Sequence, residues 1–230
     1  VSTEQKFPSV LKDQYMEPIT LQDGENKIYA ISVAENGLVS NLGIYGFTVG
    51  GVVKPMEFSD PTFEAEVRSV LGVSEEKQLY TNDLWTIKEF TMPSGVKSYA
   101  DLAHMSFLES LTIENGVSED IKYLSSLGNL TQLEIIGTAL SQESMNVIGA
   151  LPVLKELTLQ NCRLTTAAAL SDLTALVYLD LSNNTIRDIS ALSGMKNLQK
   201  LYLQSNAVTD LSAISTCTAL TNLNVSSNAL

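Results

Sequence analysis

The sequence predicts an α/β solenoid, with a parallel β-sheet on its concave side and short helical turns on its convex side. Leucines recur every 22 residues in the C-terminal half, at Leu154, Leu176, Leu198 and Leu220. Each opens the same short phrase, in which apolar and polar residues alternate as they do in a strand with one buried face. A fixed period of this length is typical of proteins whose repeats pack only on their neighbours.

The repeated phrase matches the leucine-rich-repeat pattern L-x-x-L-x-L-x-x-N/C-x-L. Its four regular copies read LKELTLQNCRL, LVYLDLSNNTI, LQKLYLQSNAV and LTNLNVSSNAL. Weaker copies begin at Leu108 and Leu130, and a degenerate first copy begins at Ile87. We therefore predict a leucine-rich-repeat solenoid of about seven rungs over residues 87–230. A rung of 22 residues leaves room on its convex side for little more than a 3₁₀ turn or a short helix.

One slot in each repeat should hold the rungs together. The residue there sits where the chain turns off the sheet, and an Asn side chain can bond the backbone groups that this turn leaves unpaired. From the last rung backwards, the residues in this slot are Asn228, Asn206, Asn184, Cys162, Thr138 and Gly116. We expect an asparagine ladder in the last three rungs, with Cys162 as a structural member of it.

The regular rungs resemble the 22-residue class of leucine-rich repeats in bacterial internalin-like surface proteins. The lead-in is similar too, with a helix over 62–71, the segment 79–84 and then the degenerate rung. The resemblance covers residues 61–230 and implies a secreted or cell-surface recognition protein of bacteria, whose signal peptide would have been removed. The same repeat class also occurs in a eukaryotic phosphatase-regulatory subunit, so a cytoplasmic location is the alternative. Residues 1–60 depart from the internalin pattern, and the sequence carries no anchor motif.

The N-terminal part divides into a β-rich appendage over 1–60 and a helical cap over 61–86. In the cap, Asp60 is a suitable N-cap residue and Pro61 suits the first helical position. The apolar face of this helix should cover the open end of the solenoid, which otherwise exposes its first strand. The residues assigned to that face are Phe63, Val67, Val70 and Leu71.

The appendage should contain a β-hairpin. Apolar stretches at 19–21 and 27–33 flank Asp-Gly-Glu-Asn at 23–26, which is a turn-forming sequence. Another strand is expected within 43–53. The glycines of that segment match no phosphate-binding motif, and the sequence gives no role for the appendage.

Composition excludes several classes of function. The chain has 26 acidic and 14 basic residues, a formal net charge of −12. It therefore offers no basic surface for nucleic acid. Its longest apolar runs, such as 50–53 and 167–170, are far shorter than the roughly 18 residues of a membrane helix. We expect neither a nucleic-acid partner nor a transmembrane segment.

The usual catalytic and metal-binding groups are missing from the sequence. The single histidine, His104, falls on the convex return of the first rung. The two cysteines, Cys162 and Cys217, fall on different sides of the solenoid and too far apart for a disulfide. We expect a protein with no enzymatic activity, no cofactor and no metal.

The alternation of the strands assigns residues to the concave face in three columns. The first column reads Glu89, Ser110, Gln132, Glu156, Tyr178, Lys200 and Asn222. The second reads Thr91, Thr112, Glu134, Thr158, Asp180, Tyr202 and Asn224. The third reads Pro93, Glu114, Ile136, Gln160, Ser182, Gln204 and Ser226.

Two features of these columns indicate a binding surface. Four carboxylates, which we call the acidic track, cross neighbouring rungs, and a tyrosine pair follows with Lys200 beside it. Tyrosines on a rigid sheet offer a large contact area at low entropic cost. The acidic track is Glu114, Glu134, Glu156 and Asp180, and the tyrosine pair is Tyr178 and Tyr202.

Three binding hypotheses follow. The first is a protein or peptide partner with a basic patch, docked on the concave face over rungs three to six. The second is a carbohydrate, because tyrosines with Asn, Gln and Asp also bind sugars. The third is self-association through residues 220–230, where the last strand presents an open edge. The alternative is that the concave face is merely exposed to solvent and binds no partner.

Overall fold

The computed structural model describes residues 24–30, 43–49 and 53–230. The chain forms two compact units, residues 1–53 and residues 54–230. The second unit thus includes residues 54–60, where Met56 N donates to Leu79 O at 2.8 Å. Those seven residues pack with the cap and the repeats.

The first unit contains an antiparallel pair of strands, β1 (Gly24–Ala30) and β2 (Gly43–Val49). The strand expected within 43–53 is β2. The turn expected at 23–26 is wrong, because Gly24, Glu25 and Asn26 lie in β1 and pair with Val49, Thr48 and Phe47. Pairing with a distant strand overrides the local turn preference of Asp-Gly. The apolar stretch expected at 19–21 lies outside the described residues.

The second unit is built on a seven-stranded parallel sheet with its strands in chain order. Equivalent positions of successive repeats pair in register, as Leu111 with Leu133 and Leu157 with Leu179. The expected α/β leucine-rich-repeat solenoid of seven rungs is confirmed. Its strands are β3 (Glu89–Met92), β4 (Ser110–Glu114), β5 (Gln132–Ile136), β6 (Glu156–Gln160), β7 (Tyr178–Asp180), β8 (Lys200–Tyr202) and β9 (Asn222–Asn224).

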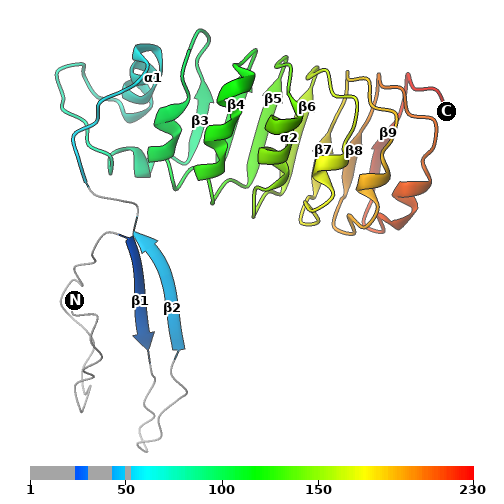
Figure 1. Ribbon diagram of the computed structural model, residues 1–230, viewed down its shortest axis with the longest axis horizontal. Helices are drawn as coiled ribbons and strands as arrows, with labels where there is room; N and C mark the ends of the chain where they lie inside the picture. Colours follow the sequence, from blue (N-terminus) through cyan, green and yellow to red (C-terminus); the bar gives the residue numbers. More distant parts are fainter. Residues whose placement is uncertain (1–23, 31–42, 50–52) are drawn as a thin grey trace, which may run out of the picture. The chain divides into compact units, whose positions relative to one another are not determined.

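Short helical turns lie on the other side of the sheet (Figure 1). The α-helix among them, α2 (Gln142–Gly149), lies in the one repeat of 24 residues, as expected. The shorter rungs form 3₁₀ turns there, because they have fewer residues to close the same distance. The 3₁₀ helices are η1 (Leu84–Thr86), η2 (Ala100–His104), η3 (Ser118–Ser126), η4 (Ala168–Leu170), η5 (Ser190–Leu192) and η6 (Ser212–Thr216).

The core lies between the sheet and these turns. The two inward positions of each central strand, such as Leu157 and Leu159 in β6, are fully buried. From the convex side, residues such as Ile189 and Leu192 complete each layer. Burial of one such side chain stabilises the fold by about 1.5–3 kcal/mol. Stacked layers of this kind make one continuous core along the unit.

Asn184 shows how the turn off the sheet is stabilised. Its Oδ1 accepts hydrogen bonds from the backbone N–H groups of Cys162 and Leu164 in the preceding rung, at 2.9 and 3.0 Å. Its Nδ2 donates to the carbonyl oxygens of Leu159 in that rung, at 2.7 Å, and Leu181 in its own rung, at 2.9 Å. One side chain therefore closes the turn and joins two rungs.

Asn206 and Asn228 repeat this arrangement in the next two rungs. Asn206 Oδ1 accepts from Ile186 N, and Asn228 Oδ1 accepts from Val208 N, both at 2.9 Å. The expected asparagine ladder is confirmed. Each of these side chains bonds backward, to the rung that precedes it in the chain.

In the earlier rungs other residues bond the backbone groups of the turn off the sheet. The buried Cys162 thiol donates to Ile135 O at 3.3 Å, and burial raises its pKa to about 11, so it stays neutral. Thr138 Oγ1 accepts from Gly116 N at 2.8 Å. Cys162 is thus a structural member of the ladder, as expected. Both cysteines are free thiols, and Cys217 packs on the convex side beside η6.

Gly116 leaves its ladder slot without a side chain, and Tyr99 fills the space. The Tyr99 ring is buried, and its hydroxyl accepts a hydrogen bond from Val117 N at 3.0 Å. A Cβ atom at Gly116 would collide with the Tyr99 hydroxyl and with Ile113 Cγ2. A tyrosine from the previous convex return therefore takes the place of the ladder residue.

The residue before each ladder slot has a left-handed backbone, with φ between 50° and 71°. Asn and Gly adopt this conformation more readily than other residues, and they hold it in four of these rungs. In the last two rungs serine takes the position. The residues concerned are Asn115, Gly137, Asn161, Asn183, Ser205 and Ser227.

The expected cap helix is α1 (Pro61–Leu71). Asp60 is its N-cap, accepting hydrogen bonds at Oδ1 from Thr62 N and Phe63 N at 2.8 and 3.1 Å. Phe63 and Val67 are buried and Leu71 is partly buried, which makes one stripe at intervals of four residues.

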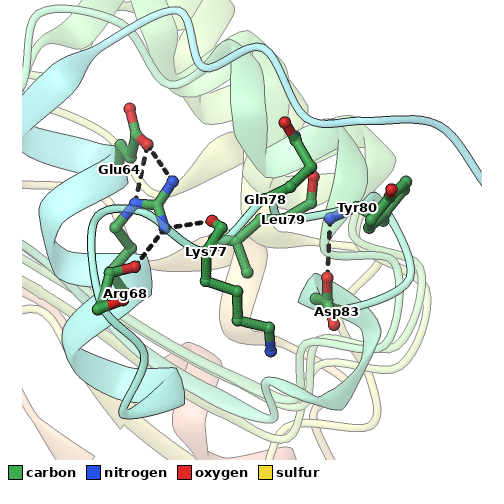
Figure 2. Close-up of polar contacts among 8 residues, drawn as sticks. Glu64, Arg68, Lys77, Gln78, Leu79, Tyr80 and Asp83 are labelled. Atoms are coloured by element: carbon green, nitrogen blue, oxygen red, sulfur yellow. Dashed lines mark hydrogen bonds and ion pairs between the residues drawn. The ribbon is translucent and has the colours of Figure 1, made fainter.

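Val70 lies off this stripe and is 46% exposed, so its assignment to the buried face is wrong. Arg68 ties the end of the helix to the following loop (Figure 2). Its Nε and one terminal nitrogen donate to Glu64 Oε1, at 2.8 and 2.6 Å. Its other terminal nitrogen donates to Ser74 O and Lys77 O, both at 2.8 Å.

We predict that Asn184→Ala lowers the free energy of unfolding by about 3 kcal/mol, because it leaves buried backbone groups of two rungs without partners. Urea unfolding followed by circular dichroism measures this change. Asn146→Ala is the matched control, because Asn146 is exposed on α2 and should change stability by less than about 0.5 kcal/mol. Equal effects of the two substitutions would contradict the role of the ladder.

Candidate functional site

The exposed face of the sheet carries the columns that the sequence predicts. In the first column Gln132 pairs in register with Glu156, Glu156 with Tyr178 and Tyr178 with Lys200. The residues of this face alternate along each strand with the buried leucines. The backbone of the sheet therefore fixes these side chains in a regular array, about 4.8 Å apart from strand to strand.

Asp180 behaves differently from the other members of the acidic track. It is 4% exposed, whereas Glu114 and Glu156 are exposed and Glu134 is partly exposed. Asp180 Oδ2 accepts a hydrogen bond from Gln160 Nε2 at 2.7 Å.

Its second oxygen, Asp180 Oδ1, accepts from Ser182 N at 2.8 Å. Both carboxylate oxygens are thus used within the fold. Asp180 belongs to the second column of the face but is buried there, so it offers little of its own surface to a partner.

The tyrosine pair spans β7 and β8. The ring centroids of Tyr178 and Tyr202 lie 5.6 Å apart, with their planes at 42°. Burial raises the pKa of the Tyr178 phenol, and the charges of Asp180 and of the neighbouring Tyr202 and Glu134 raise it further, against a hydrogen bond with Thr158. Both rings are half-buried. The ring contact holds the pair in place, with part of each ring open to contact.

A hollow of about 170 Å³ opens beside Tyr178 over β5, β6 and β7. Two carboxylates of the acidic track, Glu134 and Glu156, line it together with the tyrosine. We call it the sheet hollow. Its full lining is Gln132, Leu133, Glu134, Glu156, Thr158 and Tyr178.

The structure thus brings together Glu134, Glu156 and Tyr178, three of the seven predicted site residues. Tyr202 joins them through its ring contact, and Lys200 is exposed beside Tyr178 in the first column. Glu114, on β4, is not among the residues that line the sheet hollow.

The sequence prediction missed Gln132 and Thr158 as lining residues and Gln160 as the partner of Asp180. Their columns were predicted, but a neutral polar residue carries no signal that separates a lining residue from a solvated one.

A larger hollow, of about 360 Å³, lies on the opposite side of the unit, between η3 and α2. Its serines bond one another: Ser144 Oγ donates to Ser118 O at 3.0 Å and lies 3.0 Å from Ser141 Oγ. His104 is exposed at the end of η2, as predicted. Within the described residues no helix is long and apolar enough to cross a membrane.

These features define a leucine-rich-repeat protein, and the comparisons agree. The family model of leucine-rich repeats in two copies matches residues 152–194 and 196–230. No curated protein is similar enough in sequence to count as a relative.

Among solved structures, internalin C2 from Listeria monocytogenes is similar. It has a TM-score of 0.58 and 22% identity, over 74% of this chain and 85% of that one. The chain therefore has a leucine-rich-repeat fold of the internalin type.

Two further solved structures share weaker likeness. Another internalin of Listeria monocytogenes has a TM-score of 0.40 and 20% identity, over 74% of this chain and 70% of its own. A leucine-rich-repeat protein of Leptospira interrogans has a TM-score of 0.45 and 21% identity, over 56% of this chain and 39% of its own.

We predict that Asp180→Ala lowers the free energy of unfolding by about 2 kcal/mol, because it removes two hydrogen bonds to a buried charge. Glu156→Ala should change it by less than about 0.5 kcal/mol, since Glu156 is exposed and forms no ion pair with any described residue. Urea midpoints of the two variants provide the comparison. A larger loss from Glu156→Ala than from Asp180→Ala would contradict this division of roles.

Proposed function

We propose that this chain is a non-catalytic recognition protein that binds a protein or peptide partner on the exposed face of its sheet. The observation that carries the proposal is the tyrosine pair, half-buried and held at 5.6 Å on a rigid sheet beside unpaired carboxylates. Aromatic residues in such settings dominate the energetics of protein interfaces. A rigid array also loses little conformational entropy when a partner binds.

The charge of this face favours a basic partner. The two ion pairs of the described residues are Arg68–Glu64 and Lys88–Glu109, and neither involves the acidic track. Glu134 and Glu156 are therefore available to cations from outside. The net charge of −12 adds long-range attraction, which raises the rate of encounter with a basic protein.

A carbohydrate ligand is the alternative. Gln160 and Gln204 lie in the column beside the tyrosine pair and could bond hydroxyl groups. The two rings are tilted by 42°, so they do not form one flat platform on which a sugar could stack. Because the pair lacks a flat stacking surface, a protein or peptide fits this face better than a sugar.

We place the protein outside the cell or on its surface, as its internalin-type repeats suggest, with a cytoplasmic location as the alternative. Self-association through residues 220–230 stays a separate prediction. Leu223 and Leu230 in this segment are 43% and 60% exposed. Multi-angle light scattering at high protein concentration should give a mass above 24.9 kDa if they pair, and a monomer mass would overturn the prediction.

The recognition proposal is tested by selecting binders from a yeast-displayed library of random peptides on the full chain and from a glycan array. We expect peptides that lose at least about tenfold in affinity on Tyr202→Ala, a loss that an interface aromatic commonly gives. Val153→Ala is the control, since Val153 is 40% exposed outside the sheet face. Selected peptides that bind both variants equally would overturn the proposal, and glycan hits that depend on Tyr202 would favour the alternative.

A further inference from the structure

The sheet hollow combines three features that a cation requires. Two carboxylates line it, one aromatic ring forms a wall, and it lies open to the exposed face of the sheet. Glu134 comes from β5, Glu156 from β6 and Tyr178 from β7. Three consecutive strands thus contribute one such group each.

The two carboxylates lie diagonally across neighbouring strands. Gln132 pairs with Glu156 and Glu134 pairs with Thr158, so the two glutamates are offset by two residues. Diagonal positions of this kind are about 7–8 Å apart, and two glutamate side chains can reach a common point from there. Neither glutamate forms an ion pair or hydrogen bond within the described residues. Their acceptor capacity is unused.

The Tyr178 ring is supported from the side away from the hollow. Tyr202 on β8 packs against it, whereas the residues that line the hollow come from β5, β6 and β7. Tyr178 itself lines the hollow, so part of its side chain is open to a group that enters there. A guanidinium or ammonium group near such a ring is attracted by the negative charge of its π face.

The size of the hollow restricts what can enter it. Its volume of about 170 Å³ is below the roughly 300 Å³ at which pockets for whole small-molecule ligands begin. One long side chain of a docked protein is a better match. Arginine suits it better than lysine, because its planar guanidinium has five donors, stacks on aromatic rings and is more weakly hydrated.

We propose that the sheet hollow receives one arginine side chain of the partner, with the guanidinium bonded by Glu134 and Glu156 and packed on Tyr178. This inference rests on the proposed function and names the partner's chemistry: a protein or peptide with a protruding arginine. Lys200, exposed on the other side of Tyr178, sets the direction of the contact. Its positive charge repels a guanidinium that approaches from the β8 side, so the arginine enters over β5 and β6.

The direct test titrates the ¹⁵N-labelled full chain with N-acetyl-arginine-N-methylamide and follows the backbone amide signals. The matched probe is the citrulline compound, which has nearly the same shape and no charge. We expect the arginine probe to shift amides of β5, β6 and β7 with half-saturation on the order of 10 mM. The citrulline probe should bind at least about tenfold more weakly, because its uncharged ureido group lacks the ion-pair attraction to the two carboxylates.

Two double variants separate the hollow from the general negative charge. Glu134→Gln with Glu156→Gln should abolish the shifts. Glu75→Gln with Glu89→Gln changes the net charge equally at exposed positions outside the hollow and outside the acidic track, and should retain them. Absence of shifts at about 100 mM probe, or equal loss in both double variants, would overturn the proposal.

The peptides selected on the full chain distinguish this inference from the proposed function. One outcome is that the peptides depend on Tyr202 and also need an arginine for full affinity. If this need for an arginine disappears in the double variant Glu134→Gln, Glu156→Gln, both the recognition face and the arginine inference stand. If they depend on Tyr202 but bind equally when their arginines are replaced by citrulline, the arginine inference fails and the recognition face stands. If they do not depend on Tyr202, the proposed function fails.

Discussion

The structure depends on how each rung satisfies its backbone as the chain turns off the sheet into the core. Carbonyl and amide groups that are neither in the sheet nor in water cost about 1–3 kcal/mol each when left unpaired. Asn184 meets this requirement with both ends of its amide, accepting from Cys162 N and donating to Leu159 O. Its bonds reach the preceding rung, so the same side chain that closes one turn also joins it to the rung before. The ladder thus holds together the rungs whose paired strands carry the exposed face.

The N-terminal rungs satisfy the same requirement with different groups. Tyr99 replaces the absent side chain at Gly116, Thr138 bonds the Gly116 amide, and the Cys162 thiol bonds a carbonyl of the rung before it. α2 occupies the longer rung, between Thr138 and Cys162 in the chain. The sheet hollow lies over β5, β6 and β7, at the join between this irregular part and the regular rungs.

The candidate site combines rigidity from the core with chemistry from the exposed face. Asp180 is buried and bonded to Gln160 and Ser182 N, which fixes its side chain beside the tyrosine pair. Glu134 and Glu156 form no hydrogen bond or ion pair within the described residues. This division separates carboxylates that hold the fold from carboxylates that a partner can use, although all three belong to one track along the sheet. The proposed partner would meet side chains that the sheet already holds in a regular array, which reduces the entropy lost on association.

The sequence by itself determined the solenoid, its seven strands, the ladder and the columns of the exposed face, because all of these follow from local alternation and a repeat near 22 residues. It also determined the cap helix through Asp60 and Pro61. Only the tertiary structure decided the burial of Asp180, the use of Tyr99 at Gly116, the exposure of Val70 and the hollow beside Tyr178. It also decided the pairing of β1 with β2, where the sequence favoured a local turn. Each of these depends on contacts between side chains or strands far apart in the chain, and no local pattern records how such groups fill the space between them.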